Sequence, residues 1–270
     1  MLPYDLQFGG GGMQKLMGMV RRCMEDYQMI EAGDKVAVGV SGGKDSMALL
    51  RLLAALREYY PVPFSLEAIT VDLGFPEMDF SPVAEFCRAL EVPYTLIPTQ
   101  IKTVVFDLRQ EKNPCSMCAK MRRGSLNQAI RERGISKIAL GHHQDDAVET
   151  FLMSLIYEGR IHCFQPVTYL DRTQVTQIRP MVYLSEESIA GFVRREGIPV
   201  VENQCPADKN SKRHEIKELI AQMSREYPAL KDKVFGAVRR YPLAGWEEPS
   251  GGVFPAAQRE GGPPGAHLSD

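Results

Sequence analysis

A six-residue segment, Ser41-Gly-Gly-Lys-Asp-Ser46, constrains the fold of this chain more than any other. It follows residues 35–40, an apolar run typical of a buried parallel strand, and leads into residues 45–59, whose apolar side chains recur at helical spacing. A helix that starts there presents free N–H groups at the carboxyl edge of a sheet, where α/β proteins bind ligands. Glycine lets the backbone approach a polyanion closely, and lysine and serine add charge and hydroxyl groups. The segment therefore predicts a phosphate site.

The alternation of strand and helix continues through most of the chain. Further strands are expected at residues 65–73, 93–98 and 137–140, with one more candidate at 177–182. Further helices are expected at residues 13–30, 82–90, 117–133, 147–157, 186–196 and 214–226. This alternation predicts an α/β fold in which a parallel twisted sheet carries helices on both faces, with a small helical region at the C-terminal end.

Local composition divides the chain into four expected regions. They are an N-terminal helical segment (1–32), a nucleotide-binding domain (33–200), a helical region that carries Cys205 (201–248) and a Gly- and Pro-rich tail (249–270) that is expected to be disordered. The net charge is −2, so any nucleic-acid surface would have to be a local patch. Without a signal-peptide pattern or an apolar run of membrane-spanning length, the chain is expected to be cytoplasmic, with no membrane partner.

Cysteine spacing provides a second functional signal. Cys115 and Cys118 form a CxxC pair, and Cys205 stands in the polar segment 202–208, where a thiol has little packing reason to occur. Two thiolates at this spacing can bind one metal centre, and three would leave a coordination position open. Zinc, an iron–sulfur cluster, a catalytic persulfide pair and an ordinary pair of helix-start thiols all remain compatible with these residues.

The other three cysteines are expected to have no part in such a centre. Cys23 and Cys87 lie among helical apolar residues, which favours a place in the core. Cys163 lies within residues 161–165, a strand or loop, and is a less favoured candidate for a fourth ligand.

The phosphate segment is not a Walker A loop. That motif has glycine where Val38 stands here, and its Gly-Lys pair is followed by Ser or Thr rather than by Asp45. The order SGGKDS instead resembles the PP-loop of the N-type ATP pyrophosphatases. This resemblance implies an adenine nucleotide alpha hydrolase-like fold and cleavage of ATP between its α and β phosphates. A simple tight turn before a helix is the alternative interpretation.

Several further motifs extend the resemblance over roughly residues 13–240. They are the CxxC pair with Ala119-Lys-Met-Arg-Arg-Gly124 after it, Lys137-Ile-Ala-Leu-Gly-His-His-Gln-Asp-Asp146, Ile178-Arg-Pro180 and the single Cys205. Together with SGGKDS they are similar to the TtcA family of tRNA 2-thiocytidine synthetases. The resemblance implies ATP, Mg²⁺ and a [4Fe–4S] cluster held by Cys115, Cys118 and Cys205. The implied reaction adenylates the C2 oxygen of an anticodon-loop cytidine in tRNA and then inserts sulfur.

The resemblance also implies which residues bind ATP. The expected set is Val40, Ser41, Gly42, Gly43, Lys44, Asp45, Ser46, Asp72, Gly141, His142 and Asp145. Lys44 and Asp45 are expected to act in catalysis with the three cysteines, Asp45 by placing Mg²⁺. Asp45 could instead only favour the first turn of its helix, and His142, His143 and Asp145 could cap the next helix.

Two basic groups flank the cysteines. Arg122 and Arg123 follow the CxxC pair on one predicted helix, and Lys209, Lys212 and Arg213 follow the third cysteine. Because a tRNA backbone needs local positive charge, these five residues are expected to contact tRNA. A solvated helix face is the competing interpretation, and Arg122 could instead contact the ATP phosphates.

A tRNA thiolase is the leading functional prediction. Such an enzyme needs a sulfur donor, either a cysteine desulfurase or free sulfide, and a homodimer is plausible for this family. The alternatives are another PP-loop tRNA-modifying enzyme that forms 2-thiouridine or lysidine, and a non-enzymatic iron–sulfur sensor that keeps a nucleotide loop. Thiouridine-forming relatives usually carry extra CxxC pairs near the termini, and this sequence has none there. Lysidine formation needs no CxxC pair. The single CxxC pair with a distant third cysteine therefore favours the prediction of a thiocytidine-forming enzyme.

Overall fold

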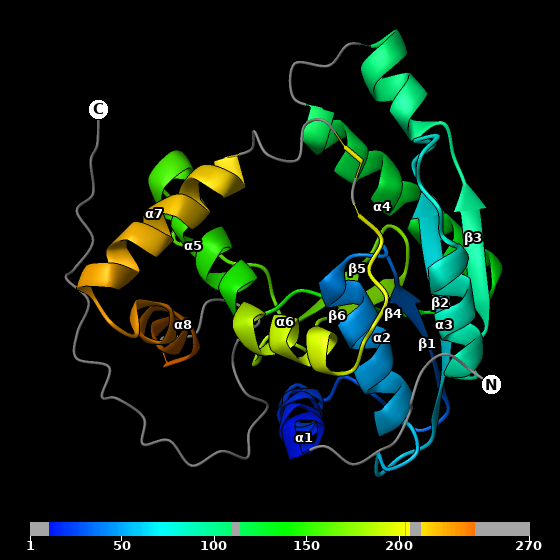
Figure 1. The fold of residues 1–270 in the computed structure, drawn as a ribbon, viewed down its shortest axis with the longest axis horizontal. Helices are drawn as coiled ribbons and strands as arrows, with labels where there is room; N and C mark the ends of the chain where they lie inside the picture. The colour runs from blue at the N-terminus through cyan, green and yellow to red at the C-terminus, as the bar shows by residue number, and fades with distance from the viewer. Residues whose placement is uncertain (1–10, 110–113, 203, 206–211, 241–270) are drawn as a thin grey trace, which may run out of the picture.

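A six-stranded sheet runs through the computed structural model, which describes residues 11–109, 114–202, 204–205 and 212–240 (Figure 1). The strands are β1 (Asp34–Gly39), β2 (Phe64–Asp72), β3 (Tyr94–Pro98), β4 (Lys137–Ala139), β5 (Val167–Leu170) and β6 (Val175–Ile178). They lie in the order β3-β2-β1-β4-β6-β5, and all neighbours are parallel except the antiparallel pair of β5 and β6. The chain runs outward from β1 to β3 and returns on the other side of β1 as β4. The carboxyl ends of β1 and β4 therefore form the switch point at which such sheets bind ligands.

Helices cover both faces of this sheet. They are α1 (Gly11–Asp26), α2 (Lys44–Leu56), α3 (Ser81–Ala89), α4 (Pro114–Glu132), α5 (Gln144–Glu158), α6 (Glu186–Arg195), α7 (Lys212–Glu226) and α8 (Leu230–Arg240). Buried residues of α1, α2, α3 and α6 share the larger core with β1 and β2, whereas α4 contributes Ile130 to a core on the other face. α7 and α8 pack on α5 and lie away from α4 in Figure 1. This arrangement confirms the predicted fold class.

β1 shows why its apolar run is continuous rather than alternating. Val36 and Val38 belong to the larger core, while Ala37 belongs to the second core with Ile130 and Ile138. Successive side chains of a strand point to opposite faces, so a strand covered on both sides needs apolar residues at every position. Each large apolar side chain buried in this way contributes about 1.5–3 kcal/mol.

Some elements differ from the sequence expectation. A π-helical turn at Thr103–Leu108, the strand β5 and the helix α8 are additional, although α7 and α8 both lie in the region expected to be helical. β5 spans four residues, too few for its periodicity to separate it from a loop. β6 ends before the expected strand at 177–182 does, because Pro180 cannot donate a hydrogen bond to a neighbouring strand.

The described residues do not test the predicted disordered tail or the predicted division into four regions. The tail at 249–270 lies outside the described residues, and the four-region division of the chain stays a prediction. Within the part of the chain that is described, no helix has the length and apolar character needed to cross a membrane.

Candidate active site

The phosphate loop between β1 and α2 closes on itself through two serine hydroxyls. Ser46 Oγ accepts a hydrogen bond from the Ser41 N–H at 3.1 Å and donates one to the Gly43 carbonyl at 2.9 Å. Gly42 has φ +84°, a conformation that glycine adopts without strain. The loop thus curves tightly at the start of α2, where unpaired helix N–H groups attract anions.

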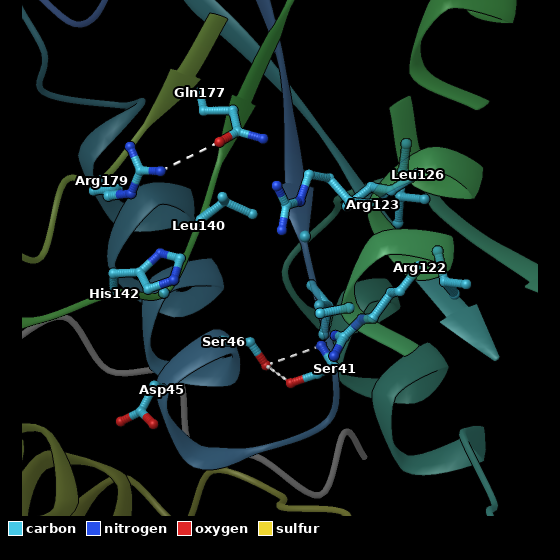
Figure 2. A pocket seen from close by; sticks show the side chains of 16 residues that line it. Ser41, Asp45, Ser46, Arg122, Arg123, Leu126, Leu140, His142, Gln177 and Arg179 are labelled. Atoms are coloured by element: carbon cyan, nitrogen blue, oxygen red, sulfur yellow. Dashed lines mark hydrogen bonds between the residues drawn. The ribbon is translucent and has the colours of Figure 1, made fainter. Parts of the chain in front are cut away.

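A cavity of about 500 Å³, the phosphate cavity, lies beside this loop at the carboxyl ends of β1, β4 and β6. Figure 2 shows its walls, with Arg179 and His142 on one side, Arg122 and Arg123 on the other, and Ser41 and Ser46 below. Of the expected ATP residues, those that line it are Val40, Ser41, Asp45, Ser46, Gly141 and His142. Its volume and its place at the switch point suit a nucleotide.

Three arginines give the phosphate cavity a positive field. Burial lowers the pKa of Arg122, and burial together with the charge of Arg123 lowers the pKa of Arg179 to about 10. Burial and the nearby Arg179 lower the pKa of His142 to about 4, so this ring is neutral near pH 7. An anion in the cavity would relieve the repulsion among these cations, which favours a polyphosphate ligand.

Asp45 is the carboxylate among the described residues that line this cavity. Its Oδ2 accepts a hydrogen bond from Lys44 at 3.1 Å. Its buried Oδ1 has no hydrogen-bond partner in the described part of the chain and lies 3.7 Å from His143 Nε2. Magnesium prefers carboxylate and phosphate oxygens. An unsatisfied carboxylate oxygen beside a phosphate cavity therefore fits the Mg²⁺ role expected of Asp45.

Lys44 is not among the described residues that line the phosphate cavity. Its Nζ donates to Asp45 Oδ2 at 3.1 Å and to Glu186 Oε1 at 3.0 Å. It also borders a separate polar cavity, which is lined mainly by residues at the starts of α5, α6 and α8. Burial acts to lower the pKa of Lys44, but the two carboxylates raise it above its ordinary value. A phosphate contact would require this side chain to leave Glu186, and the expected role stays a prediction.

The loop after β4 packs closely on the start of α2. A Cβ at Gly141 would lie 3.1 Å from both the Asp45 carbonyl carbon and the Ser46 nitrogen, so glycine permits this approach. His143 caps α5 by accepting a hydrogen bond from the Asp146 N–H at 3.4 Å, while Asp146 accepts one from the His143 N–H at 3.0 Å. The capping interpretation thus holds for His143, and His142 instead faces the cavity (Figure 2).

Two expected ATP residues make structural contacts. Asp145 Oδ2 accepts a hydrogen bond from the Glu186 N–H at 2.7 Å, and its Oδ1 accepts one from Lys231 at 2.6 Å, which ties α6 and α8 to α5. Asp72 Oδ1 accepts a hydrogen bond from the Gly74 N–H at 2.8 Å in the turn after β2. In the described structure neither aspartate lines the phosphate cavity, and their ATP roles stay predictions.

The three expected cluster ligands line a second cavity, of about 350 Å³, which we call the cysteine cavity. Cys115 and Cys118 lie near the start of α4, on one side of the helix, and Cys205 lies on the segment that follows α6. Burial raises the pKa of Cys118, and the neighbouring Cys205 and Cys115 raise it further. Folding therefore brings the distant third thiol into electrostatic range of the CxxC pair.

The two cavities share one wall. The residues that line both are Ser41, Val71, Ala119 and Arg122. Much of the remaining surface of the cysteine cavity is apolar and comes from Leu73, Phe75, Met78, Phe80 and Phe106. A group held at the shared wall would face the phosphate loop on one side and the thiols on the other.

The remaining cysteines lie elsewhere. Cys23 and Cys87 are buried in the core, as expected. Cys163 is also buried, donates a hydrogen bond to the Ala147 carbonyl at 3.4 Å and does not line the cysteine cavity. This position gives no support to Cys163 as a fourth ligand.

The residues that are expected to contact tRNA lie in different environments. Arg122 and Arg123 line the phosphate cavity. Arg213 pairs with Glu149 at 2.9 Å, and Lys212 pairs with Glu215 at 2.9 Å on the exposed surface. Lys209 lies outside the described residues. Contact with tRNA stays a prediction for all five positions.

Arg179 is a cavity residue for which sequence reasoning assigned no role. It is 6% exposed and donates hydrogen bonds to the Gln165 carbonyl at 2.6 Å and to Gln177 Oε1 at 3.2 Å. These contacts aim its guanidinium across the cavity from Arg122 (Figure 2). The sequence signal that could have identified Arg179 is its position directly after a strand, at the carboxyl edge of the sheet where ligands bind.

The chain is similar to known proteins over most of its length. The PP-loop domain family matches residues 15–223. The tRNA-cytidine(32) 2-sulfurtransferase of Anaeromyxobacter dehalogenans (strain 2CP-C) is 38% identical over 227 residues, which are 83% of this chain and 78% of that protein. A protein of the same name from Syntrophotalea carbinolica is 36% identical over 228 residues, 83% of this chain and 88% of that protein.

A solved structure shares the fold. The U34-tRNA thiolase NcsA from Methanococcus maripaludis with its [4Fe–4S] cluster superposes with a TM-score of 0.70 at 23% identity, over 85% of this chain and 78% of that one. At this identity the likeness concerns the fold alone. The sequence relatives and the matched PP-loop domain confirm the prediction of a tRNA-thiolating PP-loop enzyme, and the chain belongs to the tRNA-cytidine(32) 2-sulfurtransferase family.

Proposed function

We propose that this chain uses ATP to exchange the C2 oxygen of cytidine 32 in tRNA for sulfur. The observation that carries the proposal is the wall shared by the phosphate cavity and the cysteine cavity, where Ser41 and Arg122 border both. A cytosine held at this wall would present its C2 oxygen to the α-phosphate of ATP and its C2 carbon to sulfur at the thiols. Both half-reactions could then proceed without moving the base.

The first half-reaction makes a leaving group. The C2 oxygen attacks the α-phosphorus of ATP, the bond to pyrophosphate breaks, and the base becomes an O-adenylate. Arg122 and Arg179 line the phosphate cavity and would stabilise the charge that passes to pyrophosphate, while the N–H groups at the start of α2 would bind the phosphates. Asp45 would hold Mg²⁺ against the phosphate oxygens through its unsatisfied Oδ1.

The second half-reaction replaces AMP by sulfur. Sulfide attacks C2, and AMP departs with the original oxygen, because AMP is a far better leaving group than a carbonyl oxygen. Water would return the adenylate to cytidine. The apolar wall of the cysteine cavity, which includes Phe75, Phe80 and Phe106, limits that hydrolysis.

The cysteine cavity fits a [4Fe–4S] cluster held by Cys115, Cys118 and Cys205. The three thiols line one common cavity, as ligands that would each bind a separate iron of such a cluster would need to do. The described residues contain no group of three or more His, Cys, Asp or Glu side chains arranged for a single metal ion. Burial and the neighbouring Cys205 and Cys115 all raise the pKa of Cys118, so three thiolates in this cavity need positive charge to stay deprotonated. When bound, the cluster supplies an iron without a protein ligand, to which sulfide can bind.

The reaction also needs partners. The tRNA is the substrate, and a cysteine desulfurase or free sulfide is the sulfur donor. Cys115 is exposed, so the cysteine cavity is accessible from solvent near the CxxC pair, where a donor could deliver sulfur. A homodimer is a further option for this family.

The test is direct formation of 2-thiocytidine. The full chain, reconstituted with iron and sulfide under anaerobic conditions, is incubated with unmodified tRNA, ATP, Mg²⁺ and sulfide, and the nucleosides are then analysed by mass spectrometry. We expect thiolated cytidine together with AMP and pyrophosphate. The nucleoside mass separates this product from lysidine and from 2-thiouridine, either of which would overturn the proposal.

Variants assign the two half-reactions to the two cavities. Cys205→Ala should still form AMP from ATP but should lose thiolation, and Lys44→Ala should lose adenylation while the visible absorbance of the cluster is retained. Cys87→Ala is the matched control, because it removes a thiol from the core rather than from the cysteine cavity. Full thiolation by Cys205→Ala would contradict the assignment of Cys205 as a ligand.

A further inference from the structure

A chain of alternating charges leads away from the phosphate loop. Lys44 Nζ lies 3.1 Å from Asp45 Oδ2 and 3.0 Å from Glu186 Oε1. Glu186 also accepts a hydrogen bond from Lys217 of α7, with its two oxygens 2.8 and 2.7 Å from that amine. The Lys44 amine therefore lies between two carboxylates. Lys44 is not among the described residues that line the phosphate cavity.

Asp45 and Glu186 differ in what they can do when a nucleotide arrives. Asp45 lines the phosphate cavity and has its Oδ1 available for Mg²⁺, so a bound Mg²⁺ would share the carboxylate charge and weaken the attraction of Oδ2 for Lys44. Glu186 is directed to the polar cavity on the other side and does not line the phosphate cavity. Once Asp45 binds Mg²⁺, Glu186 is the carboxylate that holds the Lys44 amine more strongly.

Glu186 can release Lys44 at modest cost. Its second partner, Lys217, stays in place when Lys44 leaves, so the carboxylate is not stranded without a cation. Burial acts to raise the pKa of Glu186, but hydrogen bonds from Lys217 and Lys44 lower it to about 2, and the contribution of Lys217 persists when Lys44 leaves. Lys44 is 34% exposed and Glu186 is 21% exposed, and ion pairs this open to solvent contribute little.

We propose that Glu186 is a positioning residue that holds Lys44 outside the phosphate cavity until ATP and Mg²⁺ bind. ATP binding transfers the ammonium group of Lys44 from Glu186 to the phosphates, while Glu186 keeps its contact with Lys217 of α7. The affinity for ATP is then set partly by the strength of the pair between Lys44 and Glu186. This inference rests on the use of ATP in the proposed function.

The test removes the carboxylate or shortens its reach. Glu186→Gln removes the charge, and Glu186→Asp keeps the charge but withdraws it from Lys44. ATP binding to the full chain is measured by calorimetry in the presence of Mg²⁺ and without tRNA. We expect both variants to bind ATP about two- to five-fold more tightly than the wild type, the range that a solvent-exposed ion pair supports.

Glu187→Gln is the matched control. Glu187 lies in the same first turn of α6, is exposed, and has the same charge. It therefore reproduces any long-range effect of removing a negative charge near an anionic ligand. The start of α6 is held by the Glu186 backbone N–H to Asp145 at 2.7 Å, a contact that every one of these variants keeps.

A second measurement follows Lys44 itself. Amine acylation with mass spectrometry should show Lys44 more reactive in Glu186→Gln than in the wild type without ATP, and protected in both once ATP is bound. Unchanged or weaker ATP binding in both Glu186 variants, or tightening equal to that of Glu187→Gln, would overturn the inference while leaving the proposed function intact. A wild-type chain that fails to bind ATP would overturn both.

Discussion

The carbonyl of Gly42 accepts a hydrogen bond from the Val201 N–H at 2.9 Å, which joins the phosphate loop to the segment that carries Cys205. A Cβ on residue 42 would lie 2.8 Å from the Val201 Cβ, so the two backbones meet only because position 42 is glycine. In Figure 1 the segment after α6 runs past α2 toward the start of α4, where the CxxC pair lies. One contact therefore supports both the phosphate cavity and the third thiol.

Gly42→Ala should weaken ATP binding and cluster assembly together. The added methyl group meets Val201 and sits on a backbone with φ +84°, so the loop and the Cys205 segment must separate. We expect at least about a tenfold loss of ATP affinity, since relief of the clash and of roughly 1–2 kcal/mol of backbone strain moves the loop out of the conformation that binds phosphate. Calorimetry with ATP and the visible absorbance of the anaerobic protein measure the two effects.

Gly33→Ala is the matched control for that variant. Gly33 has the same φ of +84°, but nothing lies within 4 Å of an added Cβ. It should lose stability through backbone strain and keep both ATP binding and the cluster. Equal losses in the two variants would show that the contact with Val201 does not couple the sites.

Asp45→Asn should raise the Mg²⁺ requirement. The buried Oδ1 of Asp45 has no hydrogen-bond partner among the described residues, and an amide is a poorer ligand for a hard cation than a carboxylate. We expect the Mg²⁺ concentration for half-maximal AMP formation to rise by about tenfold or more. Asp232→Asn is the control, since that carboxylate bonds Gln144 away from the phosphate cavity. An unchanged Mg²⁺ dependence in Asp45→Asn would contradict this role.

His142 should make stability depend on pH in the acid range. Burial and Arg179 lower the pKa of His142 from 6.5 to about 4, so between these values the unfolded chain binds more protons than the folded one. The free energy of unfolding should therefore fall as pH drops through this window, by up to about 1 kcal/mol per pH unit. Urea unfolding at a series of pH values measures the slope.

His142→Phe isolates the titrating group. Phenylalanine keeps a ring against Phe164, whose centroid lies 5.2 Å from that of His142, and removes the proton-binding nitrogens. The acid-range slope should become shallower in this variant and persist in His162→Phe, which replaces an exposed histidine. A slope that is the same in both variants would count against the inferred pKa.

Arg213→Ala should destabilise the fold rather than only weaken tRNA binding. Arg213 joins α7 to α5 through Glu149, whose side chain is 5% exposed. Burial raises the pKa of Glu149 and Arg213 opposes that shift, so removing the arginine leaves a buried carboxylate unpaired. We expect the free energy of unfolding to fall by about 2 kcal/mol, less than for a fully buried pair because Arg213 is 43% exposed.

Lys212→Ala provides the comparison in urea unfolding. It removes an exposed pair with Glu215, which should change the free energy of unfolding by less than about 1 kcal/mol. If Arg213→Ala instead kept its stability and lost tRNA affinity, the sequence prediction of a tRNA contact would be the correct one.

Local patterns determined much of this fold. The apolar run before Ser41 and the helical spacing after it placed β1 and α2 within one to three residues of their bounds, because period and turn chemistry act between near neighbours. β5 was not predicted, because a segment of four residues is too short for its periodicity to distinguish a strand from a loop. The motifs likewise identified the phosphate loop and the three cysteines without the structure.

The tertiary structure decided which partner each side chain of the site has. Lys44 forms an ion pair with Glu186, Arg179 lines the phosphate cavity, and Arg213 forms an ion pair with Glu149. Each of these relations joins residues far apart in the chain, and their charges interact only once folding brings them within a few ångströms of one another. By itself the sequence determined that an ATP loop and three thiols exist. Their meeting at one wall depends on strand order and on the contact between Gly42 and Val201, which no local pattern encodes.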